Sequence, residues 1–320
     1  MCARYLAVKE ETSYHAGGTP DVFMEWPDSN LEPDQGMLDV EGFQTREPRL
    51  FRPGSFKSEG AFSGYLDTKL TGYWLKWFCG TASVDGTVAP YTHTFIPTQN
   101  PEGLSFVAEL GLEDITARRV AGMVVDTLTV EARARELVKV SVDAVGGSME
   151  LVSITTPTFG TVAPFAYHEG QLSIAGTAVA EVEAITLTLN NNIAEDDAYR
   201  ITRTGGRFPK KMVRGDRSIE LALDLSFDST NYVKRFMDGA TGTYPGNVYT
   251  PFEISFDFIT NEAPAGTFSA ILPRVIFNKD SIPVSGLDRL VEGLEAKAYY
   301  SAGSAYAISM SLVNGQASYG

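Results

Sequence analysis

The sequence predicts a mainly β protein built from two tandem β-sandwich or barrel domains, each with one short flanking α-helix. Three observations lead to this prediction. Apolar and polar residues alternate along many short segments, two short segments switch to helical spacing, and one stretch of the first half recurs in the second half. With 320 residues, the chain is also long enough for about two domains.

The recurring stretch introduces a strand and a helix in each half. Residues 45–67 read TREPRLFRPGSFKSEGAFSGYLD, and residues 206–228 read GRFPKKMVRGDRSIELALDLSFD. At one constant spacing, identical or similar residues match: Arg46 and Arg207, Pro48 and Pro209, Arg49 and Lys210, Gly54 and Gly215, Glu59 and Glu220, Ala61 and Ala222, Asp67 and Asp228. A repeat of this length is a whole domain rather than one supersecondary unit, so it predicts internal pseudo-symmetry.

A strand is expected directly after the basic part of each recurring stretch. In 217–227, Ile219, Leu221 and Leu223 fall on one face at a period of two, and 56–66 shows a similar alternation. β-branched and aromatic residues alternate in eight further segments, which predicts antiparallel sheet. These segments are 91–98, 105–113, 122–134, 136–146, 250–260, 266–277, 289–300 and 305–315.

About three turns of helix are expected after the first strand of each half. Large apolar residues recur at three- and four-residue spacing in 67–80: Leu70, Trp74, Trp77 and Phe78. Asp67 or Thr68 is the expected N-cap and Gly80 the expected end, and 228–239 is the matching segment in the second half. Because helices this short are unstable alone, each is expected to pack against a sheet.

The segment 153–170 is rich in Thr, Pro and Gly and links the two halves. We therefore expect a first domain over residues 1–152, with an N-terminal arm, and a second domain over residues 153–320.

Charge is distributed unevenly along the chain. The net charge is −14, which argues against a protein that grips nucleic acid through a basic face. Two loops, 43–57 and 200–217, are nevertheless basic on an otherwise acidic chain. Opposite charges placed in this way favour association between copies of one molecule.

No constellation of residues predicts a catalytic, metal or cofactor site, so we expect no enzyme. His93 is expected to be structural, and His168 beside Glu169 is weak evidence for an acid–base couple because adjacent residues of a strand face opposite ways. Cys2 and Cys79 lie in no Cys-x-x-Cys or Cys/His cluster and are expected to be reduced thiols. The sequence shows no secretory signal pattern and no apolar run of membrane-spanning length, so a chain that starts in the cytosol is expected.

Several stretches resemble phage tail tube proteins, the major tail proteins of phages with long, non-contractile tails. They are ARYLAVKEETSY, PFAYHEGQLSIAG, LTLNNNIAEDDAY and the closing RLVEGLEAKAYY…ISMSLVNG, which together span nearly the whole chain. The LTLNNNIAEDDAY block is the most specific of them. The resemblance implies a β-sandwich of the tail-tube type with a flanking helix, assembled into stacked rings that form a conduit for viral DNA.

The resemblance also implies which residues make contacts between rings. Family members resemble one another in a long loop between two early strands that reaches towards the next ring, and 33–57 and 195–217 occupy that position here. The basic residues of the two loops are the expected inter-ring contacts: Arg46, Arg49, Arg52, Arg207, Lys210, Lys211 and Arg214. Because the tube domain is duplicated, three chains rather than six are expected per ring.

Further partners and a location follow from the same resemblance. The chain is expected to bind itself in homotrimeric, pseudo-hexameric rings, with the tape measure protein in the lumen and tail terminator and distal tail proteins at the ends. Genomic DNA is expected to pass through an acidic lumen without specific binding, and no cofactor or membrane is expected. The location would be the virion, after assembly in the host cytoplasm.

Two other readings stay open at this point. A secreted or surface β-sandwich module that binds carbohydrate is the main alternative, although no secretory signal is seen and cysteines are few. A hydrolase with scattered carboxylates is the third, but no pair of the 40 acidic residues stands out.

Overall fold

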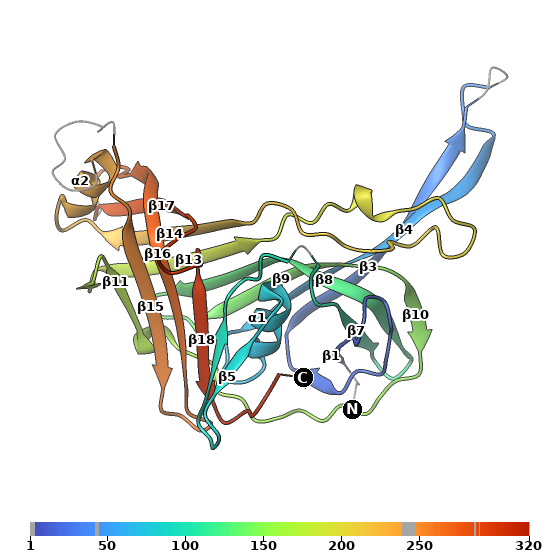
Figure 1. Ribbon diagram of the computed structural model, residues 1–320, viewed down its shortest axis with the longest axis horizontal. Helices are drawn as coiled ribbons and strands as arrows, with labels where there is room; N and C mark the ends of the chain where they lie inside the picture. Colours follow the sequence, from blue (N-terminus) through green and yellow to red (C-terminus); the bar gives the residue numbers. More distant parts are fainter. Residues whose placement is uncertain are drawn as a thin grey trace.

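The computed structural model describes residues 4–41, 45–100, 102–238, 248–284, 286–287 and 289–319. It confirms the prediction of a mainly β protein with two short helices. Figure 1 shows a broad sheet in the upper part of the molecule, with α1 beneath it and a long hairpin projecting to one side.

In each half, the predicted strand, the helix after it and the further strands occur in the predicted order, and additional strands accompany them. The first half contains β1 (Tyr5–Glu10), β2 (Val22–Met24), β3 (Asp28–Val40), β4 (Leu50–Tyr65), α1 (Thr71–Cys79), β5 (Ser83–Asp85), β6 (Tyr91–Phe95), β7 (Phe106–Leu112), β8 (Thr116–Arg133), β9 (Lys139–Gly146) and β10 (Met149–Val152). The second half contains β11 (Gly170–Ile174), β12 (Thr177–Val179), β13 (Val182–Asn190), β14 (Ser218–Ser226), α2 (Asn231–Asp238), β15 (Phe252–Thr260), β16 (Gly266–Ser281), β17 (Val291–Ala298) and β18 (Ser309–Asn314).

The strand pairings of the first half recur in the second. In the first half, β1 pairs with β2 and β7, β4 pairs with β3 and β9, and β8 pairs with β7, β9 and β10. In the second half, β11 pairs with β12 and β15, β14 pairs with β13 and β17, and β16 pairs with β15, β17 and β18. Each of these strand pairings is antiparallel, as the alternation predicted.

One continuous sheet runs through both halves in the order β3–β4–β9–β8–β13–β14–β17–β16. The connection between halves is β8 with β13, where Thr127–Arg133 pairs with Ala184–Asn190. A second connection is β18 with β6. The halves expected to divide after residue 152 therefore share backbone hydrogen bonds and one sheet.

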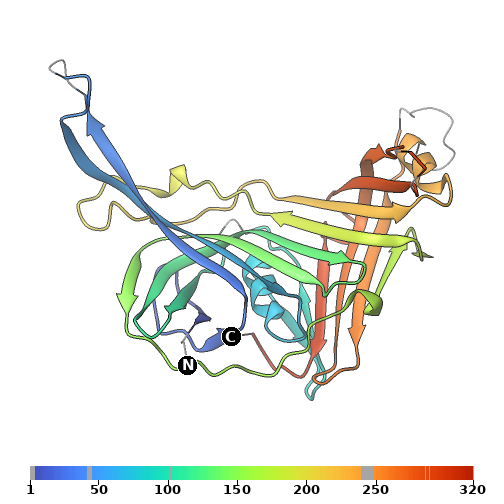
Figure 2. The ribbon, with the colours of Figure 1, turned by 180° about the vertical axis from the view of Figure 1, so that it is seen from behind.

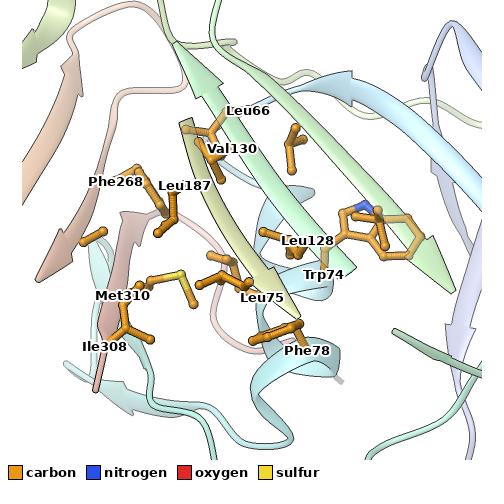
Figure 3. Close-up of a cluster of buried hydrophobic side chains, with 14 of the residues drawn as sticks. Leu66, Trp74, Leu75, Phe78, Leu128, Val130, Leu187, Phe268, Ile308 and Met310 are labelled. Carbon is orange, nitrogen blue, oxygen red and sulfur yellow. The ribbon is translucent and has the colours of Figure 1, made fainter. Parts of the chain in front are cut away.

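Helix α1 packs against this sheet, and the main core forms around it. Figure 3 shows Trp74, Leu75 and Phe78 of α1 among Leu128 and Val130 of β8, Leu187 of β13 and Met310 of β18. Trp77 stacks on Phe106, with 4.4 Å between ring centroids. Because the helix contributes apolar side chains to strands of both halves, the core is common to the two halves.

The ends of α1 follow the sequence prediction in part. Gly80 ends the helix with φ 79°, a left-handed conformation that favours glycine, and its N–H donates to the Lys76 carbonyl at 2.7 Å. The N-cap position is Leu70 rather than Asp67 or Thr68. Asp67 instead accepts a hydrogen bond from the backbone N–H of Lys69 at 2.7 Å, and burial raises its pKa to about 6.

Helix α2 covers the second half less completely. Its apolar side chains, Tyr232, Val233, Phe236 and Met237, are half-buried, and Arg235 lies over the ring of Phe252 at 5.3 Å. The expected helix end at Gly239 lies outside the described residues.

A buried carboxyl lies on β17 of the second half. The side chain of Glu292 is fully buried, and neither carboxylate oxygen has a hydrogen-bond partner among the described residues. Burial, followed by the nearby charge of Asp280, raises the pKa of Glu292 from 4.5 to about 7. The folded chain therefore keeps a proton on Glu292 between these pH values, whereas the unfolded chain releases it.

We expect this group to make the free energy of unfolding fall as the pH rises from 4.5 towards 7. The pKa difference corresponds to about 3 kcal/mol of stability, present in full below pH ~4.5 and lost above pH ~7. Urea unfolding across this range measures the dependence, with Glu292→Gln as the control that removes it. Identical pH dependence in the two proteins would contradict the prediction.

Candidate assembly surface

The hairpin formed by β3 and β4 is an exposed feature of the molecule. The two strands pair from Asp28 opposite Ser63 out to Val40 opposite Leu50. Figures 1 and 2 show from opposite sides that the outer part of this hairpin leaves the body of the molecule. A hairpin of this length without a covering layer has side chains accessible on both faces.

Apolar side chains gather on the outer part of the hairpin. Five of them are exposed: Met37, Leu38, Val40, Leu50 and Phe51. Leu50 is 65% and Phe51 68% exposed, although both sit within a paired strand. In the strand register, Leu38, Val40 and Leu50 share one face of the hairpin and Met37 and Phe51 share the other. Each face therefore carries exposed apolar groups of the kind that mark a contact site for another molecule.

Three of the predicted contact residues lie at the end of the same hairpin. Arg46, Arg49 and Arg52 are all exposed there, next to the apolar residues. The first residues of the predicted basic loop, 43 and 44, lie outside the described residues. The hairpin thus combines an apolar surface with a cluster of guanidinium groups that suits a partner with both apolar and acidic groups.

The second basic loop joins β13 to β14 and contacts the base of the hairpin. The backbone N–H of Phe56 donates to the Arg207 carbonyl at 2.7 Å, and Arg207 Nε donates to the Gly54 carbonyl at 2.9 Å. Lys57 forms an ion pair with Glu195 at 2.7 Å, which together with Glu59 raises the pKa of Lys57. The two basic loops, far apart in the sequence, therefore form one surface.

Two more predicted contact residues of the second loop are exposed. Lys210 and Lys211 have accessible side chains, and Lys211 forms an ion pair with Glu102 of the first half. An exposed pair of this kind contributes little to stability, so the charge of Lys211 stays available to a partner.

Arg214 differs from the expectation of an exposed contact residue. Its side chain is buried, and Nη2 donates to the Trp77 carbonyl in the last turn of α1 at 2.6 Å. A guanidinium is favourable at a helix C-terminus because the last carbonyls carry partial negative charge. Burial, followed by the nearby charge of Arg217, lowers the pKa of Arg214 to about 10. Arg214 therefore anchors the second loop to α1 within the chain.

The face of the eight-stranded sheet opposite α1 is largely bare and polar. Along each strand, half-exposed or exposed polar residues alternate with the buried residues of the core. The acidic side chains on this face include Asp28, Glu32, Asp34, Glu59, Glu131, Asp143, Glu220, Asp224 and Glu295, and the basic ones include Lys57, Arg133, Lys139, Lys279 and Lys297. Acidic groups outnumber basic ones, so the face carries negative charge.

One histidine and one cysteine that the sequence analysis considered for chemistry, His93 and Cys79, are buried. His93 is buried, and its Nε2 lies 2.7 Å from the Gln316 carbonyl oxygen. Cys79 is buried and free, burial raises its pKa to about 12, and Cys2 lies outside the described residues. Within the described residues, no group of His, Cys, Asp and Glu side chains could hold a metal ion.

The comparison with known families identifies the kind of protein that carries this surface. A family model described as phage tail tube protein matches residues 3–305. The chain belongs to the phage tail tube protein family. This assigns it a structural role in the tail of a virion. No curated protein matches the chain.

The tail tube assignment agrees with the resemblance seen in the sequence, and the structure adds surfaces that sequence reasoning missed. The apolar surface of the hairpin was missed, although MLDV at residues 37–40 and LF at 50–51 carry its residues. In the described part of this tail tube protein, neither helix is long and apolar enough to cross a membrane.

Proposed function

We propose that this tail tube protein assembles into closed rings of three chains, which stack into the tube that conducts DNA during ejection. The observation that carries the proposal is the recurrence of the strand pairings, which supports two similar units per chain. We take these units to be 1–152 and 153–320. Two similar units per chain would give a trimer six similar positions around a pseudo-sixfold axis.

The projecting hairpin and the second loop together form the contact to the neighbouring ring in this proposal. Exposed apolar residues on the hairpin supply buried area, and the surrounding basic residues supply attraction to an acidic surface. The inter-ring residues are Arg46, Arg49, Arg52, Arg207, Lys210 and Lys211. Arg214 is left out because its guanidinium is buried within its own chain.

The bare sheet face is proposed to line the lumen. DNA carries one negative charge per about 1.7 Å, so an acidic wall repels it and lets it slide without specific binding. The proposal keeps the tape measure protein as the occupant of the lumen before ejection, and tail terminator and distal tail proteins as partners at the ends. Assembly would take place in the host cytoplasm, and no step requires catalysis.

Electron microscopy of the purified protein tests the proposal. We expect rings or tubes whose averaged end views show six similar lobes, with a ring mass equal to three chains by native mass spectrometry. A ring of six whole chains with twelve lobes would contradict the trimeric arrangement. A monodisperse monomer under all assembly conditions would contradict the tube function itself.

A further inference from the structure

The two halves place different residues at one position of the sheet. In the first half, Val140 of β9 pairs with Gly64 of β4. In the second half, Glu292 of β17 pairs with Leu225 of β14, and Leu225 stands at the position of Gly64 in the recurring stretch. A buried valine of the first half is therefore matched by a buried carboxylic acid in the second.

A neighbouring position of the sheet shows the same exchange. In the first half, Leu128 of β8 pairs with Val142 of β9. At the corresponding pairing of the second half, Asp280 of β16 pairs with Leu294 of β17. Figure 3 shows Leu128 among the side chains of α1. Two carboxyl groups thus stand in the second half where aliphatic side chains support the helix in the first.

Nothing among the described residues satisfies the charge of Glu292. This residue is 0% exposed, and in the described part of the chain both of its carboxylate oxygens lack a hydrogen-bond partner. Oδ1 of Asp280 is buried without a described partner as well. A buried polar group without hydrogen bonds is unfavourable, and an ionised one is far more so. The site therefore favours the protonated form of Glu292.

The titratable and charged groups around Glu292 are mainly acidic. Asp280 projects from β16 on the same face of the sheet. Burial, followed by the charges of Glu181 and Glu292, raises the pKa of Tyr232 on α2, so these two carboxyl groups lie near the helix. Arg235 of α2 supplies positive charge there, but its guanidinium lies over an aromatic ring of β15. Ionisation of Glu292 would add negative charge to a group that already has an excess of it.

Helix α2 is attached less firmly than α1. In α1, Lys76 forms an ion pair with Glu10 of β1 at 2.7 Å, and Trp77 Nε1 donates to the same carboxylate at 3.1 Å. The described side chains of α2 form no hydrogen bond or ion pair with a strand. A cavity of about 380 Å³ also lies between α2 and the hairpin of β11 and β12. The contacts of α2 are therefore mainly those of its half-buried apolar side chains.

We propose that α2 is a pH-sensitive cover of the second half, which stays docked over β16 and β17 while Glu292 is protonated and detaches when Glu292 ionises. Helix α1 stays docked in both states, because Leu128 and Val140 occupy the corresponding positions beneath it. The proposal concerns a single chain and does not depend on the proposed ring.

Detachment of α2 is the easiest way to bring the carboxylate of Glu292 into water. Its strand, β17, is hydrogen-bonded to β14 on one side and to β16 on the other, so moving the strand would break two ladders. Local opening uses the elements with the fewest buried contacts, and α2 is such an element. Burial and the charge of Asp280 raise the pKa of Glu292 to about 7 in the closed form. The open form releases this proton at a lower pH, so opening becomes easier as the pH rises.

Hydrogen–deuterium exchange of the full-length protein, read by mass spectrometry, tests the cover. After correction for the intrinsic pH dependence of exchange, peptides of α2 report its opening constant, and peptides of α1 are the reference in the same sample. We expect the opening constant of α2 to rise at least about tenfold between about pH 5 and about pH 8. The opening constant of α1 should stay nearly constant.

Variants of β16 and β17 assign the effect to one carboxyl group. Glu292→Gln removes the ionisable group and keeps its size, so α2 should stay protected at the higher pH. Asp280→Leu with Glu292→Val is a second variant, which gives both positions aliphatic residues as in the first half and should have the same effect. Glu295→Gln, on the exposed face of β17, is the matched control and should keep the wild-type pH dependence.

Three outcomes would overturn the proposal. One is an opening constant of α2 that does not change with pH in the wild type. Another is wild-type pH dependence in the variants that lack the Glu292 carboxyl. The third is equal opening of α1 and α2, which would assign the effect to unfolding of the whole chain. Each of these outcomes would leave the proposed function standing, because none of them depends on rings.

Discussion

Replacing Arg46, Arg49 and Arg52 with serine is expected to leave the chain folded and to slow tube growth at least tenfold. Truncating one member of a buried charged pair costs about 2–5 kcal/mol, and about 1.4 kcal/mol already changes an association constant tenfold. Light scattering measures growth, and circular dichroism checks the fold. Salt at about 1 M, where the Debye length is roughly 3 Å, should slow the wild type in the same direction.

The matched control is Arg133→Ser, Lys139→Ser and Lys297→Ser, which removes the same charge from the bare sheet face. We expect this variant to keep most of the wild-type growth rate, because exposed ion pairs contribute little and these residues lie away from the hairpin. Equal slowing in the two variants would mean that only net charge matters. Wild-type growth of the hairpin variant would show that the guanidinium groups do not hold rings together.

If the hairpin arginine variant grows at the wild-type rate, the exposed apolar side chains of the hairpin would account for the contact between rings. Leu38→Ser with Phe51→Ser removes two of its most exposed side chains without changing charge. Slowed growth in this variant alone would assign the contact between rings to apolar burial.

Replacing Trp74 with alanine is expected to lower the free energy of unfolding by about 3–5 kcal/mol. The indole is fully buried, and its ring centroid lies 5.2 Å from those of Trp26 and Trp77 and 5.4 Å from that of Phe62. Because this cluster joins α1 to the common core, the loss should also lower the yield of assembled protein. Urea unfolding followed by circular dichroism gives the free energy.

Phe236→Ala in α2 is the matched control for Trp74→Ala. Phe236 is an aromatic residue of α2 and is only half-buried. Its replacement should therefore lower the free energy of unfolding clearly less than Trp74→Ala does. Equal costs would show that the two helices contribute alike to one core. A cost below about 1 kcal/mol for Trp74→Ala would contradict the central place given to α1.

Much of the fold could be predicted from local patterns. Ile219, Leu221 and Leu223 alternate with polar or small residues and lie buried on β14, because side chains of a strand point to opposite faces in turn. The glycine that ends α1, Gly80, was likewise predictable because it adopts a left-handed conformation that other residues avoid.

The candidate site was predictable only in part. Arg46, Arg49 and Arg52 are exposed on a projecting hairpin, as a basic loop between strands suggested. Arg214 looked the same in the sequence but is buried against the end of α1. Nothing local distinguishes an arginine that meets solvent from one that meets a helix carbonyl, since the carbonyl of Trp77 lies far away in the chain.

The sequence by itself determined many of the strands, the two helices, the recurrence of one half in the other and the family, whereas the expected loop 33–57 contains paired residues of β3 and β4. Only the tertiary structure decided that β8 pairs with β13, that the two basic loops meet at Gly54 and Arg207, and that β3 pairs with β4 alone among the described residues. The reason is physical. Alternation and capping act between neighbours in the chain, whereas backbone hydrogen bonds are the same for nearly every residue and do not encode which distant strand completes an edge.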